Sequence, residues 1–192
     1  MNEAEVLAVL EEKGAILRGH FLLSSGRHSG VFAQKFRVFE HPGLGQRFGE
    51  ELSHAFENRF DVVASPAVGA LILGFCTALA AGARFVFSER MDGAMVFRRG
   101  FELSPHERVL VVEDVVTTGG SAREVVDLVR ASGAAPVGVG ALVDRVDPTR
   151  SMDFGAPLRS LVSLPATSWE PSECPLCEQG VPLDDPGSRR LG

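Results

Sequence analysis

An apolar run that ends in two adjacent acids is the feature that most constrains the fold of this chain. Val109 to Val112 are four consecutive aliphatic residues, and Glu113 and Asp114 follow them directly. A strand with one face in water alternates apolar and polar residues, whereas a continuous aliphatic run is typical of a parallel strand buried on both faces. The run therefore predicts a central strand of a parallel sheet, with the acid pair at its carboxyl end.

A turn rich in hydroxyl groups and glycine follows the acids. Residues 117–121 read Thr-Thr-Gly-Gly-Ser, and an amphipathic stretch begins near Ala122. Free N–H groups and the dipole at a helix start attract phosphate, while carboxylates suit sugar hydroxyls or a hydrated magnesium ion. Threonine, serine and glycine also cap ordinary helices. The order of strand, acids, turn and helix favours a ribose 5-phosphate site.

Strand and helix patterns alternate along the chain. Strands are expected at residues 61–64, 84–87, 94–98, 137–143 and 158–164, and helices at 43–58, 70–81 and from 122 to about 132. This alternation predicts an α/β fold with a central parallel sheet flanked by helices and with ligands at the carboxyl ends of its strands. We expect an N-terminal segment at 1–42, a core at 43–165 and an irregular tail at 166–192 packed on the core.

Composition narrows the classes of partner. The formal net charge of −6 argues against a general nucleic-acid binder, which usually presents a basic face. No apolar run is long enough to cross a bilayer, and nothing near Met1 has the pattern of a signal peptide, so we expect a cytoplasmic protein with no membrane partner. Three cysteines are too few and too unevenly placed for a disulfide framework.

EDVVTTGGS at 113–121 resembles the phosphoribosyl pyrophosphate signature of type I phosphoribosyltransferases. GHFLLSSGRHS at 19–29, followed by EHP at 40–42, resembles the orotate phosphoribosyltransferases among them, and the CPLC tail is similar to one branch. The resemblance implies the type I fold, with residues 1–42 forming a small hood. It also implies transfer of a ribosyl 5-phosphate group to orotate in pyrimidine biosynthesis, a Mg²⁺ cofactor and a homodimer with shared active sites.

The resemblance implies a role for each residue of the signature. Glu113, Asp114 and Arg90 form the catalytic set, with the two acids on the ribose hydroxyls and on metal-bound water. The donor, phosphoribosyl pyrophosphate, is expected to contact Glu113, Asp114, Val115, Val116, Thr117, Thr118, Gly119, Gly120 and Ser121. No side chain is expected to bind the magnesium ion directly, because the substrate holds it.

Four residues are expected to contact the acceptor, orotate: Thr117, Arg145, Phe32 and Lys35. A guanidinium fork can pair with the carboxylate of orotate. The alternative for Arg145 is an ordinary ion pair with Asp144 or Asp147, and Phe32 equally suits the core. His28 is interpreted as a surface or hydrogen-bonding residue rather than a catalyst.

The loop at residues 65–70 resembles the family's pyrophosphate loop, in which Ala67, Val68 and Gly69 would offer backbone amides to the leaving group. An ordinary turn between strand and helix is the alternative. The stretch SERMDGAMVFRRGF at 88–101 departs from the family pattern, because it contains arginines but no lysine or histidine. Two further hypotheses therefore stay open: transfer to a purine or another base, and a non-catalytic regulator that binds phosphoribosyl pyrophosphate.

Cys174 and Cys177 form an isolated Cys-x-x-Cys pair near the end of the chain. Such a pair supplies half of a tetrahedral zinc site, which would need a partner subunit or distant ligands to complete it. The sequence favours a tight proline-containing turn with two free thiols, and redox pairing is a third interpretation.

Overall fold

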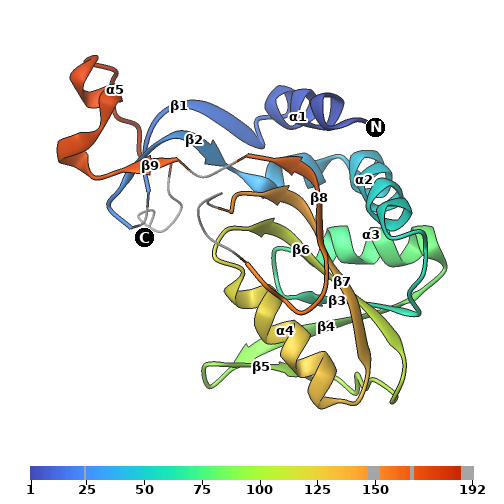
Figure 1. Cartoon of the computed structure of the whole chain (residues 1–192). Helices are drawn as coiled ribbons and strands as arrows, with labels where there is room; N and C mark the ends of the chain where they lie inside the picture. The colour runs from blue at the N-terminus through green and yellow to red at the C-terminus, as the bar shows by residue number, and fades with distance from the viewer. Residues whose placement is uncertain (24, 147–151, 165–166, 187–192) are drawn as a thin grey trace.

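A six-stranded sheet forms the centre of the protein (Figure 1). The computed structural model describes residues 1–23, 25–146, 152–164 and 167–186. In spatial order the strands are β5 (Ala94–Phe97), β4 (Arg84–Met91), β3 (Val62–Pro66), β6 (Arg108–Val116), β7 (Ala135–Asp144) and β8 (Leu158–Ser163). The sheet is mixed, because β5 returns antiparallel to β4 while the other neighbours are parallel. The central strand expected from the aliphatic run is confirmed as β6.

Helices cover both faces of this sheet. The helices α1 (Glu3–Glu12), α2 (Pro42–Ala55) and α3 (Leu71–Ala81) share one core with Leu110 and Val112, whereas α4 (Gly120–Ala131) shares another with Val109 and Val111. Alternate residues of β6 thus serve opposite faces, as a doubly covered strand requires. Among the described residues, no helix is both long enough and apolar enough to cross a membrane.

Some boundaries differ from those expected. The helix predicted at 43–58 ends at Ala55, because Glu57 and Asn58 adopt left-handed backbone angles that a helix cannot continue. The strand predicted at 84–87 continues to Met91, since pairing with β5 extends it. Residue type alone did not reveal either change.

The N-terminal segment and the tail form a second, three-stranded sheet beside the core (Figure 1). Its strands are β1 (Ile16–Leu22), β2 (His28–Ala33) and β9 (Ser168–Trp169), and the 3₁₀ helix η1 (Lys35–Glu40) follows β2. Beyond β9 come the 3₁₀ helix η2 (Pro171–Glu173) and the short helix α5 (Pro175–Glu178). The described tail is therefore more regular than the sequence suggests, and it pairs with the hairpin. Residues 24, 165 and 166, which belong to the expected hood and to the expected tail boundary, lie outside the described residues.

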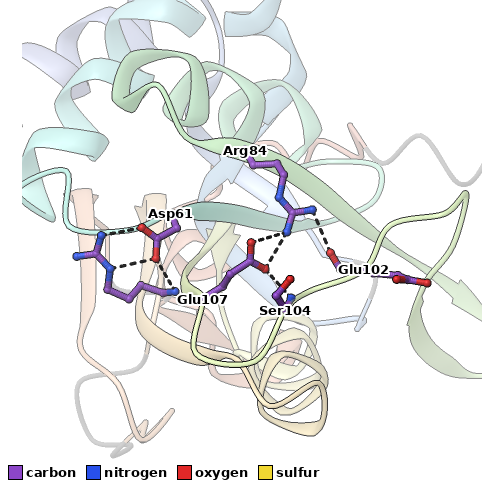
Figure 2. Close-up of polar contacts among 6 residues, drawn as sticks. Asp61, Arg84, Glu102, Ser104 and Glu107 are labelled. Atoms are coloured by element: carbon purple, nitrogen blue, oxygen red, sulfur yellow. Dashed lines mark hydrogen bonds and ion pairs between the residues drawn. The ribbon is translucent and has the colours of Figure 1, made fainter.

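Ion pairs fasten the amino ends of the parallel strands. Figure 2 shows Arg84, at the start of β4, holding the Glu107 carboxylate at 2.8 Å, while the backbone N–H of Ser104 donates to the same group. Asp61, just before β3, accepts hydrogen bonds from the Arg108 guanidinium at 2.7 and 3.1 Å, which lower the pKa of that carboxyl to about 2. The charged groups at the amino end of the sheet are thus paired with one another, so we expect ligands at the carboxyl end.

Gly49 allows α2 and α3 to approach closely, and we expect Gly49→Ala to destabilise the fold. A Cβ atom at position 49 would lie 2.5 Å from the carbonyl carbon of Cys76 and 2.7 Å from its oxygen. The helices must then separate, at a cost of about 1–3 kcal/mol in the free energy of unfolding. Gly43→Ala in the same helix is the control, because nothing lies within 4 Å of its added Cβ. Equal unfolding midpoints in urea for both variants would contradict the packing argument.

Candidate functional site

The two acids at the end of β6 are both buried, and Asp114 is held by a lysine from the N-terminal segment. The Lys35 Nζ atom lies 3.0 Å from Oδ1, to which it donates, and 2.8 Å from Oδ2 of Asp114. The backbone N–H of Val115 also donates to Oδ1, at 2.6 Å. Despite the nearby ammonium group, Oδ2 accepts no hydrogen bond from the described residues. One buried oxygen of the carboxylate therefore retains capacity for a ligand.

Glu113 has an unusually high proton affinity. Burial of its side chain is the main cause, and the negative charge of Asp114 adds to it, so that its pKa is raised to about 8 although Lys35 acts in the opposite direction. A buried carboxylate beside a second one resists ionisation because neither charge is fully solvated. In the ligand-free protein Glu113 therefore holds its proton near neutral pH.

The loop that follows β3 approaches these acids so closely that only glycine fits at its end. A Cβ atom at Gly69 would lie 2.1 Å from Oδ2 of Asp114 and 2.9 Å from the Lys35 ammonium. The loop and the acids line a polar cavity of about 240 Å³, whose residues are Lys35, Pro66, Ala67, Val68, Gly69, Glu113, Asp114, Val115 and Ser121. The three loop residues named from the sequence thus face the acid pair across one cavity.

The hydroxyl-rich turn forms an adjoining hollow of about 60 Å³ at the start of α4. Its walls are Glu113 and residues 115–122, so it shares Glu113, Val115 and Ser121 with the larger cavity. Gly119 takes a left-handed φ of +69°, no side chain caps the helix, and no acid lies in its first turn. The first N–H groups of α4 are therefore available to an anion, as the sequence predicts.

Arg145 is buried beside this turn with donors to spare. Its backbone N–H donates to the Val116 carbonyl at 2.8 Å, and its Nη2 donates to the Val31 carbonyl at 3.3 Å. Its Nε finds no partner among the described residues, and burial lowers the pKa of the guanidinium. The Asp144 carboxylate accepts instead from the backbone of Val146, and Asp147 lies outside the described residues. Such a buried cation suits an anionic ligand.

Other residues named from the sequence lie away from the two cavities. Phe32 is half-buried and packs against Phe21, with ring centroids 5.7 Å apart. Arg90 is exposed on β4 and forms a 2.8 Å ion pair with Glu124 of α4. Pro66 and Ala122 also line the cavities; they belong to segments identified from the sequence, but the resemblance assigns a role only to their neighbours.

Comparison with known proteins places this geometry in a family. The model of the phosphoribosyl transferase domain matches residues 44–157. An orotate phosphoribosyltransferase from Caldanaerobacter subterraneus subsp. tengcongensis is 49% identical over 192 residues, which cover both chains completely. The chain belongs to the orotate phosphoribosyltransferases. Another family member, from Thermotoga maritima, is 47% identical over 185 residues, or 95% of this chain and 97% of that one.

Solved structures of orotate phosphoribosyltransferases have the same fold. The enzyme from Aeropyrum pernix matches with a TM-score of 0.66 and 27% identity, over 83% of this chain and 93% of that one. The Mycobacterium tuberculosis protein, solved in complex with inorganic phosphate, matches with a TM-score of 0.64 and 27% identity, over 84% and 95% of the two chains. The type I phosphoribosyltransferase fold expected from the sequence is confirmed.

We expect Glu113→Gln to stabilise the ligand-free protein, increasingly so as the pH rises from about 5 to about 8. In the unfolded chain Glu113 ionises near 4.5, but in the folded protein only at about 8. Between these values the unfolded state releases a proton that the folded state keeps, so stability falls by up to about 1.4 kcal/mol per pH unit. The amide removes this loss.

The measurement is the melting temperature of both proteins across this pH range. The difference in melting temperature between Glu113→Gln and the wild-type protein should widen with pH. It should level off above about 8, where Glu113 is ionised in the folded state as well. Glu102→Gln, at an exposed carboxylate, is the control and should follow the wild-type curve. Parallel curves for Glu113→Gln and the wild-type protein would rule out an elevated pKa.

Proposed function

We propose that this protein transfers the ribosyl 5-phosphate group from phosphoribosyl pyrophosphate to N1 of orotate, forming orotidine 5′-phosphate and pyrophosphate in pyrimidine biosynthesis. The observation that carries the proposal is the meeting, around adjoining cavities, of a buried acid pair, an uncapped helix start and the loop ending at Gly69. Full-length relatives named orotate phosphoribosyltransferases support the choice of acceptor. We propose that it works in the cytoplasm, where free thiols such as Cys76 stay reduced.

The donor would bind along the carboxyl end of β6. The N–H groups and hydroxyls of residues 117–121 suit the 5-phosphate, and the carboxylates of Glu113 and Asp114 suit the ribose hydroxyls. The amides of Ala67, Val68 and Gly69 face the same cavity and would receive the pyrophosphate. The two hollows thus match the two anionic ends of one substrate.

The residues present fit a magnesium ion that is held mainly by the substrate. Two carboxylates alone make no cage for the ion, and the Lys35 ammonium already lies against one of them. Glu113 and Asp114 would therefore hold the ion through its water molecules, and the bound ion would neutralise charge on the departing pyrophosphate. Arg90 would join it, since an exposed pair such as Arg90–Glu124 is weak and easily exchanged.

Orotate would bind on the Arg145 side of the site. The buried guanidinium with an unpaired Nε offers a fork to the carboxylate of orotate, and the exposed Thr117 hydroxyl lies on the adjoining turn. Phe32, in β2, is a candidate to cover the base. As pyrophosphate leaves, the anomeric carbon becomes positive, and the Asp114 carboxylate would stabilise that charge without a protein nucleophile.

An exposed apolar strip supports the proposal of a homodimer with shared active sites. Ile72, Phe75 and Leu79 recur at helical spacing on α3, and the last two are 55% and 63% exposed. Val68 of the pyrophosphate loop is 71% exposed and lies just before this helix. A second copy that covers the strip would therefore reach the cavity, where Arg98 of the β5 end is a candidate to act across the interface.

Turnover of orotate, followed by its loss of absorbance with phosphoribosyl pyrophosphate and Mg²⁺, tests the reaction. We expect turnover with orotate and not with uracil, adenine or hypoxanthine. Arg145→Gln should raise the KM for orotate by about 30–100-fold, because it removes a buried charged hydrogen-bond donor, and leave the KM for the donor nearly unchanged.

Arg37→Gln, at an exposed arginine paired with Glu40, is the matched control and should behave like the wild-type enzyme. Turnover of a purine instead of orotate would show that the protein is a phosphoribosyltransferase for a different acceptor base. Donor binding without turnover of any base would identify a regulator and refute the catalytic proposal.

The dimer has its own test. We expect the wild-type protein to show about twice the 20.5 kDa of one chain in light scattering after gel filtration. Phe75→Glu combined with Leu79→Glu should give monomers and lower turnover, because the charges would be buried at the interface. Leu183→Glu, at an exposed apolar residue of the tail, should leave the mass unchanged. A monomeric wild-type enzyme with full activity would exclude shared sites.

A further inference from the structure

Four metal-binding side chains from opposite ends of the chain meet outside the proposed active site. His20 and His28 come from the β1–β2 hairpin, and Cys174 and Cys177 come from the tail. One ligand atom from each lies within 4.8 Å of the other three, and three of the four residues are buried. None of them lines the two cavities at the end of β6. The cluster is therefore a separate feature.

Four of the six distances within the cluster are close to the edges of a metal tetrahedron, and all six are within 4.8 Å. The Nε2 atom of His20 lies 2.9 Å from Nδ1 of His28, 3.4 Å from Sγ of Cys174 and 3.7 Å from Sγ of Cys177. The Cys177 Sγ is 3.3 Å from the same Nδ1. Zinc bonds of ordinary length at tetrahedral angles place nitrogens about 3.3 Å apart and nitrogen about 3.5 Å from sulfur. All four distances lie within about half an ångström of these edges.

The hydrogen bond between His20 Nδ1 and the Val181 carbonyl leaves the inner nitrogen, Nε2, free to bind a cation. Its Nδ1 lies 2.8 Å from the Val181 carbonyl oxygen, and because a carbonyl only accepts, Nδ1 carries the proton. The lone pair of Nε2 then points at the cluster, where it meets one imidazole nitrogen and two sulfurs. One lone pair cannot accept hydrogen bonds from all three, whereas one cation can bind all four groups. Histidine ligands of metals usually have such an outer partner.

The backbone around the cluster brings the two pairs together. The N–H groups of Cys177 and Glu178 donate to the Cys174 carbonyl at 3.1 and 3.3 Å, which forms a tight turn around the two cysteines. The strand β9 pairs with β2, and His28 lies opposite Trp169. The N–H of Asp184 donates to the His20 carbonyl at 2.8 Å. The tail is thus hydrogen-bonded to the hairpin both before and after the two cysteines.

The tail and the adjoining part of the hairpin have little apolar support, although Arg27 donates hydrogen bonds to Ser168 and Glu170. Neither apolar core of the described residues includes a residue from 17–30 or from the tail after 167. Small modules that cannot bury enough apolar surface are often held by a structural metal instead. A cation would also satisfy two buried imidazoles and the buried thiol of Cys174, whose partners among the described residues are one another, Cys177 Sγ and the Val181 carbonyl.

We propose that His20, His28, Cys174 and Cys177 bind one structural zinc ion, which fastens the C-terminal tail to the β1–β2 hairpin. Two nitrogens and two thiolates in a tetrahedral set are typical of zinc, and four protein ligands leave no open position for catalysis. Binding releases the thiol protons to solvent, so no oxidant or reductant is needed. In this proposal the two histidines are the distant ligands that the cysteine pair requires, and zinc-bound thiolates take the place of the free thiols that the sequence favours.

The first test is the metal content of the full-length, tag-free protein after equilibration with zinc and gel filtration. We expect about one zinc per chain by elemental analysis for the wild-type protein. Cys177→Ser should reduce it to less than about a tenth, because the exposed Cys177 supplies one of only four ligands. Cys76→Ser and His54→Gln, at a cysteine and a histidine outside the cluster, are the matched controls and should keep the zinc.

A cobalt spectrum keeps the proposal testable even if Cys177→Ser folds poorly. Demetallated wild-type protein loaded with Co²⁺ should show the intense visible bands of tetrahedral cobalt and a thiolate charge-transfer band in the near ultraviolet. Cys177→His, which exchanges one ligand for another, should still bind cobalt with about half of that charge-transfer intensity, since one of two thiolates remains.

Wild-type protein that retains no zinc and gives no tetrahedral cobalt spectrum would overturn the proposal. Equal loss of zinc from Cys76→Ser and from Cys177→Ser would overturn it as well. A Cys174–Cys177 disulfide in protein purified under reducing conditions would identify a redox pair instead. None of these results depends on orotate turnover, so the zinc site and the proposed reaction can fail independently.

Discussion

Burial of two adjacent carboxyl groups at the end of β6 is the constraint on which the rest of the site depends. Both acids lie where solvent is excluded; Lys35 pairs with Asp114, and burial beside Asp114 raises the pKa of Glu113 to about 8. The fit leaves room only for glycine at position 69. A ligand that brings hydroxyl groups therefore meets two carboxyl groups that are already positioned to hydrogen-bond with it, and a bound cation would favour the ionised form of Glu113.

The two ends of the sheet differ: the amino end is stabilised by ion pairs, and the carboxyl end carries the candidate functional site. At the amino end Arg84, Glu107, Asp61 and Arg108 pair with one another and leave no need for a ligand (Figure 2). At the carboxyl end no side chain caps the start of α4, and among the described residues Nε of Arg145 has no hydrogen-bond partner and Oδ2 of Asp114 has only its ion pair with Lys35. Unsatisfied groups gathered at one end of a parallel sheet are the physical reason to expect a ligand there.

The sequence predicts those parts of the fold that local pattern determines. The aliphatic run at Val109 to Val112 identifies the central strand, and the glycine turn before Ala122 identifies the start of α4, because both depend on neighbours in the chain. Contacts between residues that are far apart in the sequence produce no local pattern of this kind. The contact of Lys35 with Asp114 joins residues 79 apart, and that of His20 with Cys174 joins residues 154 apart. Neither spacing matches a motif, so only the folded chain brings these groups together.

One strand connects the proposed zinc site with the proposed acceptor site. His28 begins β2 within the metal cluster, the Val31 carbonyl further along receives Arg145, and Lys35 follows the strand and reaches Asp114. A strand fixed at its first residue by a metal keeps the later residues in register, since a shift of one residue would turn each side chain to the opposite face. The position of the hydroxyl-rich turn at residues 117–121 depends instead on β6 and α4, which belong to the core. Loosening the tail would therefore disturb Arg145 and Lys35 before it disturbs the proposed 5-phosphate site.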